Sequence, residues 1–185
     1  MDDPRPVLVR SIARRIPAGK QSAVKARPVP LAGHLAAGDA LRLTMLECLA
    51  QVCANAGVMR TGRDPETLHQ LRVGLRRLQI ALCGFGEESR SPAHKELRER
   101  TRAIASRLGP ARDLDIFLGQ MLRGPMKDAG DDGGFVLLKS RAEAARETAW
   151  DGALECVASA DFAVFLDDVA AEAERTPMYA DKPLR

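Results

Sequence analysis

Residues 69–82 read HQLRVGLRRLQIAL, and the periodicity of this stretch says more about the architecture than any other part of the chain. Successive residues of an α-helix advance by about 100°, so residues three, four and seven apart share a face. One such face carries only leucine, which suits the core of a helical bundle. Its members are Leu68, Leu71, Leu75, Leu78 and Leu82. The pattern predicts a long amphipathic helix that packs against other helices.

A second stripe of mixed character runs beside the leucines. It alternates apolar Val73 and Ile80 with basic His69, Arg72 and Arg76. This mixture predicts a partly enclosed surface lined with cations. An arginine guanidinium stays charged and offers several donors in a fixed fork, which suits phosphate groups, and helix turns about 5.4 Å apart place the forks in a row. An amphipathic helix whose arginines lie in solvent fits this stretch equally well.

The composition favours further helices and no strand. Of the 185 residues, 45% are hydrophobic but only 4% are aromatic, and Leu, Ala, Arg and Glu predominate. Helix start signals occur at Asp64 before Pro65. The same signal recurs at Ser91 before Pro92. We predict an all-α antiparallel helical bundle, with helices over about 41–57, 65–84, 92–108, 113–122, 135–158 and 161–175.

The domain organisation follows from proline content and charge. Residues 1–35 read as a basic, proline-rich arm or linker, residues 36–176 as the helical domain and residues 177–185 as a tail. The net charge is +5 over residues 1–35, +4 over residues 63–125 and −6 over residues 126–185. Concentrated basic charge indicates an anionic partner.

The segment LGPARDLDIFL, residues 108–118, carries the second motif. Gly109 and Pro110 predict a sharp break, after which Asp113 caps a short helix. Asp113 and Asp115 have a spacing seen among metal ligands, but without a nearby His or Glu we interpret them as a cap and a salt bridge to Arg112 or Arg107. We expect no metal site.

Several classes of protein do not fit the sequence. No apolar run reaches the roughly 18 residues of a membrane span, and the N-terminus has no secretion signal, so we expect a cytoplasmic protein without membrane contact. The four cysteines lack a CxxC spacing and are expected to be reduced and buried. No GxSxG, Walker A or HExxH motif occurs, and His34 and His94 have no evident partners. We therefore expect no catalytic residues, no cofactor and no enzyme activity.

The two motifs together resemble the CHAD family, the conserved histidine α-helical domain. Its His-x-x-Arg-x-x-x-Arg-Arg-Leu helix is matched by His69, Arg72, Arg76, Arg77 and Leu78, and its Leu-Gly-x-x-Arg-Asp-x-Asp turn by Leu108, Gly109, Arg112, Asp113 and Asp115. The similarity extends over about residues 29–175. It implies two similar four-helix halves around a basic channel that holds inorganic polyphosphate, and association with polyphosphate granules.

The resemblance also bears on what surrounds the domain. Lys25–Leu31, KARPVPL, looks like the connector that follows a triphosphate-tunnel domain of the CYTH type, but no CYTH activity is carried over to this chain. Only the first half of the CHAD domain is recognisable in the sequence. Because half of such a domain would leave an apolar flank uncovered, we expect a homodimer in which the second copy supplies the missing half.

The predicted polyphosphate-binding residues fall into three groups. His69, Arg72 and Arg76 come first, and Arg112 and Arg77 second, although Arg77 lies about a quarter turn from the His69 stripe and rests on the family motif. Further basic residues are predicted to line the channel walls, with solvated surface positions as the alternative. They are Arg98, Arg102, Lys139 and Arg146.

Two other functions are compatible with the sequence. A histidine phosphotransfer bundle presents His-x-x-Lys-x-Gly on an exposed helix, and His69, Arg72 and Gly74 imitate that motif. A nucleic-acid-binding helical protein would also use a basic groove, but only Phe85 lies near the basic helix as an aromatic platform for stacking.

Overall fold

The computed structural model describes residues 22–29, 31, 35–124 and 132–176. These residues form six α-helices and one short 3-10 helix and contain no strand, which confirms the all-α prediction. The elements are α2 (Ala37–Met59), α3 (Pro65–Gly84), η1 (Gly86–Ser89), α4 (Pro92–Arg107), α5 (Gly109–Arg123), α7 (Gly133–Ala158) and α8 (Ala160–Arg175). No helix among them is long and apolar enough to cross a membrane.

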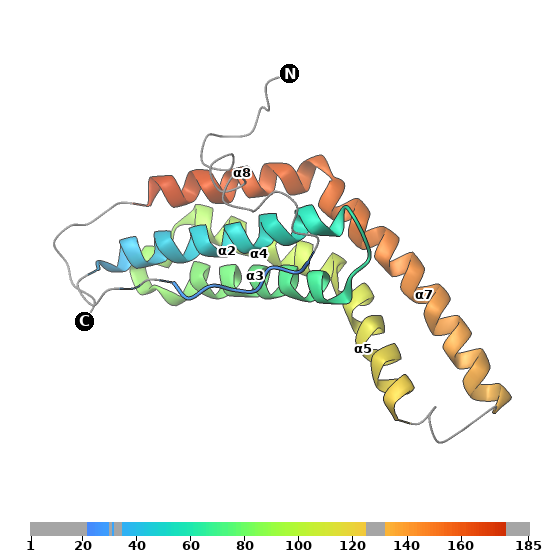
Figure 1. Cartoon of the computed structure of the whole chain (residues 1–185). Helices are drawn as coiled ribbons and strands as arrows, with labels where there is room; N and C mark the ends of the chain where they lie inside the picture. The colour runs from blue at the N-terminus through green and yellow to red at the C-terminus, as the bar shows by residue number, and fades with distance from the viewer. Residues whose placement is uncertain (1–21, 30, 32–34, 125–131, 177–185) are drawn as a thin grey trace.

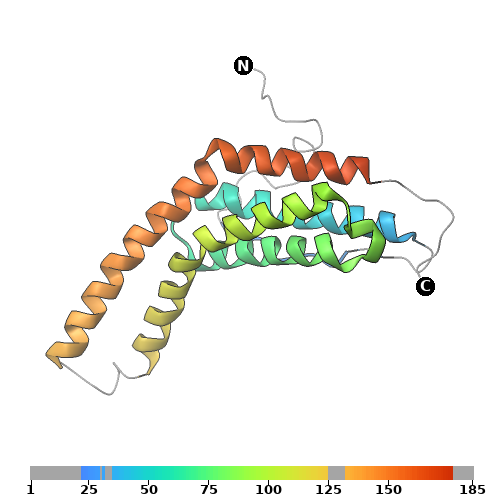
Figure 2. The same cartoon turned by 180° about the vertical axis from the view of Figure 1, so that it is seen from behind.

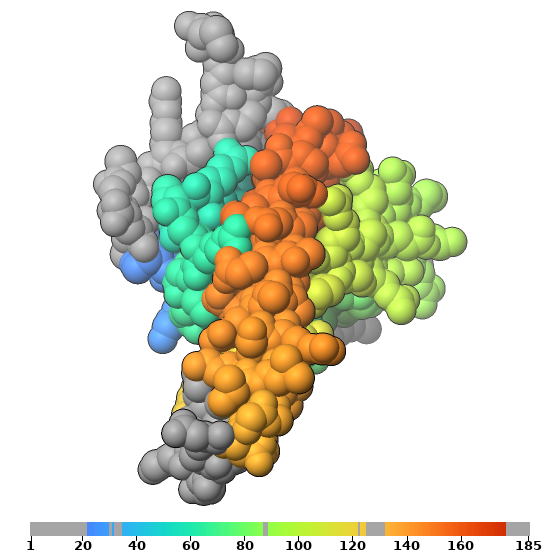
Figure 3. All heavy atoms as spheres, turned by 90° about the vertical axis from the view of Figure 1, so that its right-hand side faces the viewer, coloured from blue at the N-terminus to red at the C-terminus, as the bar shows by residue number. Residues whose placement is uncertain are grey.

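Helices α2, α3, α4 and α8 form an antiparallel bundle, and α5 and α7 pack against each other as a hairpin that projects from one end of it (Figures 1 and 2). The side view shows α7 as a ridge that runs along the hairpin and up onto the bundle (Figure 3). The hairpin therefore gives α5 and α7 surfaces that the bundle does not cover.

The leucine face of α3 lies at the centre of the bundle, as predicted. Leu68, Leu71, Leu75, Leu78 and Leu82 are all fully buried. They pack with residues of α2 and α8 such as Met45, Leu49 and Phe165. Burial of one leucine side chain stabilises the folded state by about 1.5–3 kcal/mol, so this face fixes the position of α3.

The helix starts follow the predicted capping signals. The Asp64 carboxylate accepts hydrogen bonds from the backbone N–H groups of Glu66 and Thr67, and Pro65 occupies the first turn of α3. Ser91 caps α4 through the backbone N–H of His94, with Pro92 in the first turn. The bounds predicted for α3 are confirmed.

The predicted break before Gly109 and Pro110 is confirmed, since α4 ends at Arg107, but the next helix starts earlier than predicted. Helix α5 begins at Gly109, directly after α4, and Leu108 between them keeps a right-handed helical backbone (φ −83°, ψ −13°). A proline fits the first turn of a helix because the N–H it lacks would have no partner inside the helix there. Asp113 consequently lies within α5 and does not cap it.

The described part of the predicted linker is anchored to the bundle. Residues 22–29 contain no helix, and the Asn55 side chain makes hydrogen bonds of 2.9 Å to both the backbone N–H and the carbonyl of Val24. Most of the predicted arm, residues 125–131 between α5 and α7, His34 and the tail lie outside the described residues.

The cysteine prediction holds for two of the four residues. All four are free thiols, and Cys48 and Cys156 are buried, but Cys53 is only half-buried and Cys83 is exposed. Cys83 follows Leu82, which takes the core position at this end of α3, so the thiol points to the outside.

Candidate functional site

The outer face of α3 carries the first of the predicted binding residues. His69 is half-buried and Arg76 is exposed, and neither side chain has a hydrogen-bond or ion-pair partner among the described residues. Ile80, one turn beyond Arg76, is 58% exposed. This face is therefore open in a single copy of the chain.

Arg72 lies between α3 and α4. Its guanidinium Nη1 donates a hydrogen bond of 2.5 Å to the carbonyl oxygen of Ala105, near the end of α4. This bond fixes the head group and leaves other N–H groups of the fork for a ligand. Helical spacing explains this position of Arg72. It follows Leu68 by about one turn, and the difference in rotation moves its side chain out of the core towards α4.

Helix α4 presents two more of the predicted arginines on the same side. Ala105 follows Arg98 by seven residues and Arg102 by three, so all three occupy the side of α4 that lies beside α3. Arg98 is half-buried, Arg102 is exposed, and neither has a partner in the part of the chain that the structure describes.

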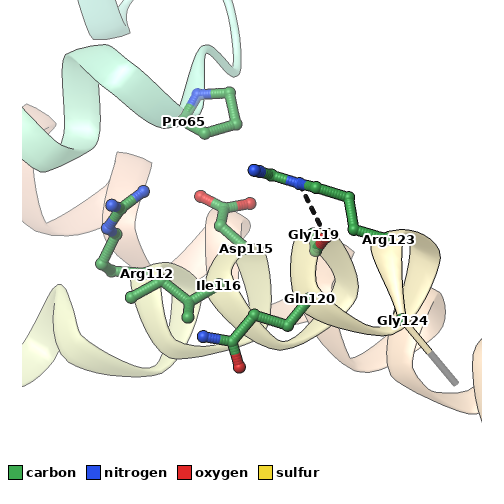
Figure 4. A pocket seen from close by; sticks show the side chains of 8 residues that line it. All are labelled: Pro65, Arg112, Asp115, Ile116, Gly119, Gln120, Arg123 and Gly124. Carbon is green, nitrogen blue, oxygen red and sulfur yellow. Dashed lines mark hydrogen bonds between the residues drawn. The ribbon is translucent and has the colours of Figure 1, made fainter.

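Arg112 continues this basic surface onto α5. It lines a pocket of about 650 Å³ together with Pro65, the first residue of α3 (Figure 4). His69 follows Pro65 by one turn, which brings the α3 row next to Arg112. We refer to these six residues together as the basic face: His69, Arg72, Arg76, Arg98, Arg102 and Arg112.

The pocket beside Arg112 also contains residues that the sequence analysis missed. Arg123 and Gln120 line it, and the Arg123 Nε donates to the carbonyl of Gly119 (Figure 4). The separation of Arg112 and Arg123 in the sequence could have indicated this, because eleven residues are close to three helix turns and place both arginines on the same face of α5.

Asp115 has a structural partner different from the predicted ones. Its Oδ1 accepts hydrogen bonds from the Arg146 Nε (2.6 Å) and from the Trp150 indole N–H (3.2 Å), which ties α5 to α7. The predicted salt bridge of the Asp113 and Asp115 pair to Arg112 or Arg107 is not present. The described residues contain no cluster of His, Cys, Asp and Glu that could hold a metal ion.

Three predicted residues lie away from the basic face. Arg77 donates to the Gln51 side chain (2.9 Å) and to the carbonyl of Arg27, on the α2 side of α3. Arg146 pairs with Asp115 and stacks over Trp150, and Lys139 lies 3.7 Å from Glu143 on its own helix. The structure does not bring these three cations together with His69.

The acidic side chains neutralise arginines on the other sides of the molecule. Arg100 of α4 pairs with Asp168 of α8 at 2.6 Å, and Arg63 pairs with Glu147 and Asp151 of α7. The excess negative charge of the C-terminal third therefore lies on α7 and α8. The basic face on α3, α4 and α5 has no such ion pairs among the described residues.

His94 and Gly74 both have packing roles. His94 is buried, with its Nε2 3.2 Å from Oε1 of Glu172, a partner that the sequence did not reveal. Gly74 is buried against α2, where an added Cβ would lie 2.9 Å from Cγ2 of Val52. Gly74 thus allows α2 and α3 to approach and does not share the surface of His69.

The comparisons with known proteins agree with the two sequence motifs. The family model described as CHAD domain matches residues 44–185, which is more than half of the chain. The chain belongs to the CHAD family. CHAD domains are associated with polyphosphate binding. No curated protein and no solved structure matches the chain.

Proposed function

We propose that this CHAD protein binds inorganic polyphosphate along the basic face. The observation that carries the proposal is a set of basic side chains without partners. No hydrogen bond or ion pair within the described residues is made by the side chains of His69, Arg76, Arg98, Arg102 and Arg112, whereas Arg63 and Arg100 are paired. A charged group that the fold leaves unpaired on a shared surface is available to an external anion.

The arrangement of the cations suits a linear polyanion better than a single ion. Arg72 and Arg76 are one turn apart on α3, and Arg98 and Arg102 are one turn apart on α4, so each helix repeats a cation about every 6 Å. A chain of phosphates presents negative charge continuously and can contact both rows. An isolated phosphate could engage only one or two of these groups.

The binding test uses two double variants with the same change in net charge. Arg76→Ala with Arg102→Ala removes two exposed cations of the basic face, and Arg107→Ala with Arg141→Ala removes two exposed arginines of α4 and α7 that are not part of it. Titration with polyphosphate of defined length should show a loss of affinity of about tenfold or more in the first variant only, since hydrogen bonds to charged groups contribute about 1.5–3 kcal/mol each.

The salt dependence gives a second measure of the same contacts. For a single-stranded polyanion the logarithm of the association constant falls with the logarithm of the salt concentration by about 0.7 per phosphate contact, so the first double variant should flatten the slope by about 1.4. Circular dichroism should be unchanged for both variants because all four side chains are exposed. An equal loss of affinity in both variants would mean that only net charge matters and would refute the site.

We further propose that polyphosphate is preferred over nucleic acid and that the protein binds without catalysing a reaction. Phe85, the aromatic residue nearest to the basic helix in the sequence, is partly buried against the core, which reduces the ring surface that a base could stack on. In competition at fixed salt, polyphosphate should displace RNA, and no orthophosphate should be released on prolonged incubation. Displacement of polyphosphate by an equal concentration of RNA phosphate would favour the nucleic-acid alternative.

A homodimer is part of the proposal. The projecting hairpin exposes five large apolar side chains that are 39–55% accessible: Ile116 and Phe117 on α5 and Val136, Leu137 and Leu138 on α7. Exposed apolar side chains that lie together on the hairpin favour contact with a partner, which we propose is a second copy of the chain. The second copy would also narrow the space around the open basic face. A cytoplasmic location and association with polyphosphate granules complete the proposed role.

The oligomeric state can be tested with a matched pair of variants. Leu137→Glu places a charge on the hairpin and should convert a sedimenting dimer to a monomer without loss of helicity. Val164→Glu changes an equally exposed residue of α8, which is 53% accessible, and should leave the dimer intact. A wild-type protein that sediments as a folded monomer at micromolar concentration would exclude the dimer.

A further inference from the structure

A second basic pocket lies where the chain turns from α3 through η1 into α4, at the opposite end of α3 from the pocket beside Arg112. It has a volume of about 440 Å³. We call it the turn pocket, and its lining residues are Cys83, Gly86, Ser89, Arg90, Ser91, Lys95 and Arg98. Of these, only Arg98 belongs to the predicted binding residues.

The side chains of the turn pocket fit an anion. Three of the lining residues, Arg90, Lys95 and Arg98, carry positive charge, and none of the described lining residues carries a carboxylate. Lys95 and Arg98 have no hydrogen-bond or ion-pair partner among the described residues. The first turn of α4 contains no acidic residue that would offset this charge.

The turn pocket is continuous with the basic face. Arg98 belongs to both, and Arg102 follows it by one turn along α4. On α3 the same path leads from His69 through Arg76 to Cys83, a distance along the helix of about 21 Å at 1.5 Å per residue. A flexible polyanion that lies along α3 and α4 therefore reaches the turn pocket if it is long enough.

We propose that the turn pocket is a second phosphate-binding subsite, occupied by one segment of the same polyphosphate chain that the basic face binds. This inference rests on the proposed function and adds a length requirement to it. A chain that extends from His69 to Lys95 can fill both regions at once, whereas a triphosphate can fill only one of them at a time. Lys95, in this account, is a specificity-determining residue for long chains.

Cys83 allows occupancy of the turn pocket to be measured directly in the intact protein. Its thiol is exposed and lines the pocket, whereas Cys48 and Cys156 are buried. Alkylation by iodoacetamide, followed peptide by peptide with mass spectrometry, reports Cys83 separately from Cys53. Long-chain polyphosphate should slow the reaction of Cys83 several-fold, and tripolyphosphate at the same phosphate concentration and ionic strength should slow it much less.

A substitution distinguishes occupancy from general screening of charge. Lys95→Ala should lower the affinity for long-chain polyphosphate about tenfold, as expected for the loss of one charged hydrogen bond, and lower the affinity for tripolyphosphate less, because a triphosphate can also bind elsewhere on the basic face. Arg107→Ala on the same helix is the control. If the wild type binds long-chain polyphosphate but Cys83 reacts at its free rate and Lys95→Ala binds normally, the subsite is refuted and the basic face stands. If long-chain polyphosphate does not bind at all, both proposals fail.

Discussion

Replacement of Asp115 by alanine should destabilise the protein far more than the same change at Asp113, two residues earlier on α5. The side chain of Asp115 is only 2% exposed and accepts hydrogen bonds from Arg146 and Trp150, so it joins the two helices of the hairpin. Asp113 is exposed and has no partner among the described residues. The two substitutions thus share a helix and a chemistry but differ in burial.

The size of the effect follows from the groups left behind. The indole N–H of fully buried Trp150 loses its acceptor, at a cost of about 1–3 kcal/mol, and Arg146 loses a charged hydrogen bond of about 1.5–3 kcal/mol. Two features reduce the sum. Arg146 keeps Glu147 as a second partner, and Oδ2 of Asp115, which is buried without a hydrogen bond, no longer needs to be desolvated. We expect a net loss of about 2–4 kcal/mol.

Thermal unfolding followed by circular dichroism measures this loss. For a chain of this size about 1 kcal/mol corresponds to about 2–4 °C, so Asp115→Ala should lower Tm by about 4–16 °C. Asp113→Ala should lie within about 0.5 kcal/mol of the wild type. A double-mutant cycle with Arg146→Ala should show coupling between the two side chains. If the Asp115 and Asp113 variants melt alike, the buried tie between α5 and α7 does not contribute to stability and the reasoning is wrong.

Two further substitutions test the packing. Gly74→Ala should destabilise the protein by about 1–2 kcal/mol in urea unfolding, because its Cβ would overlap Val52. Gly57→Ala, in an open helical position, should instead stabilise the protein by up to about 1 kcal/mol. Equal effects of the two substitutions would argue against close approach of α2 and α3. Burial raises the pKa of the Cys48 thiol from 9.0 to about 11, so the thiol of the unfolded chain loses its proton at lower pH than that of the folded chain. The contribution of this group to the free energy of unfolding is therefore fully present below about pH 9 and is lost as the pH rises towards 11. The Tm of the wild type should therefore fall more steeply over this pH range than that of Cys48→Ala, and parallel curves would contradict the role of burial.

Much of the candidate site could be predicted because it depends on short-range spacing. His69, Arg72 and Arg76 follow from one helix, and Arg98 and Arg102 from the next. The structure adds that acidic residues of α7 and α8 form their ion pairs with other arginines, such as Arg63 and Arg100. The sequence could not show that Arg77 and Arg146 lie away from the basic face. Their partners, Gln51 and Asp115, are 26 and 31 residues away in the sequence.

The amino-acid sequence by itself determined the helices and their core faces. Capping side chains, proline positions and leucine periodicity act within a few residues, so the start of α3 at Asp64 and its buried leucine row were already fixed locally. Tertiary structure alone decided that Asp115 binds across to α7 and that the basic face ends in a pocket beside Cys83. Each of these depends on which distant groups meet when the helices pack, and the spacing of residues along a single helix carries no information about its neighbours.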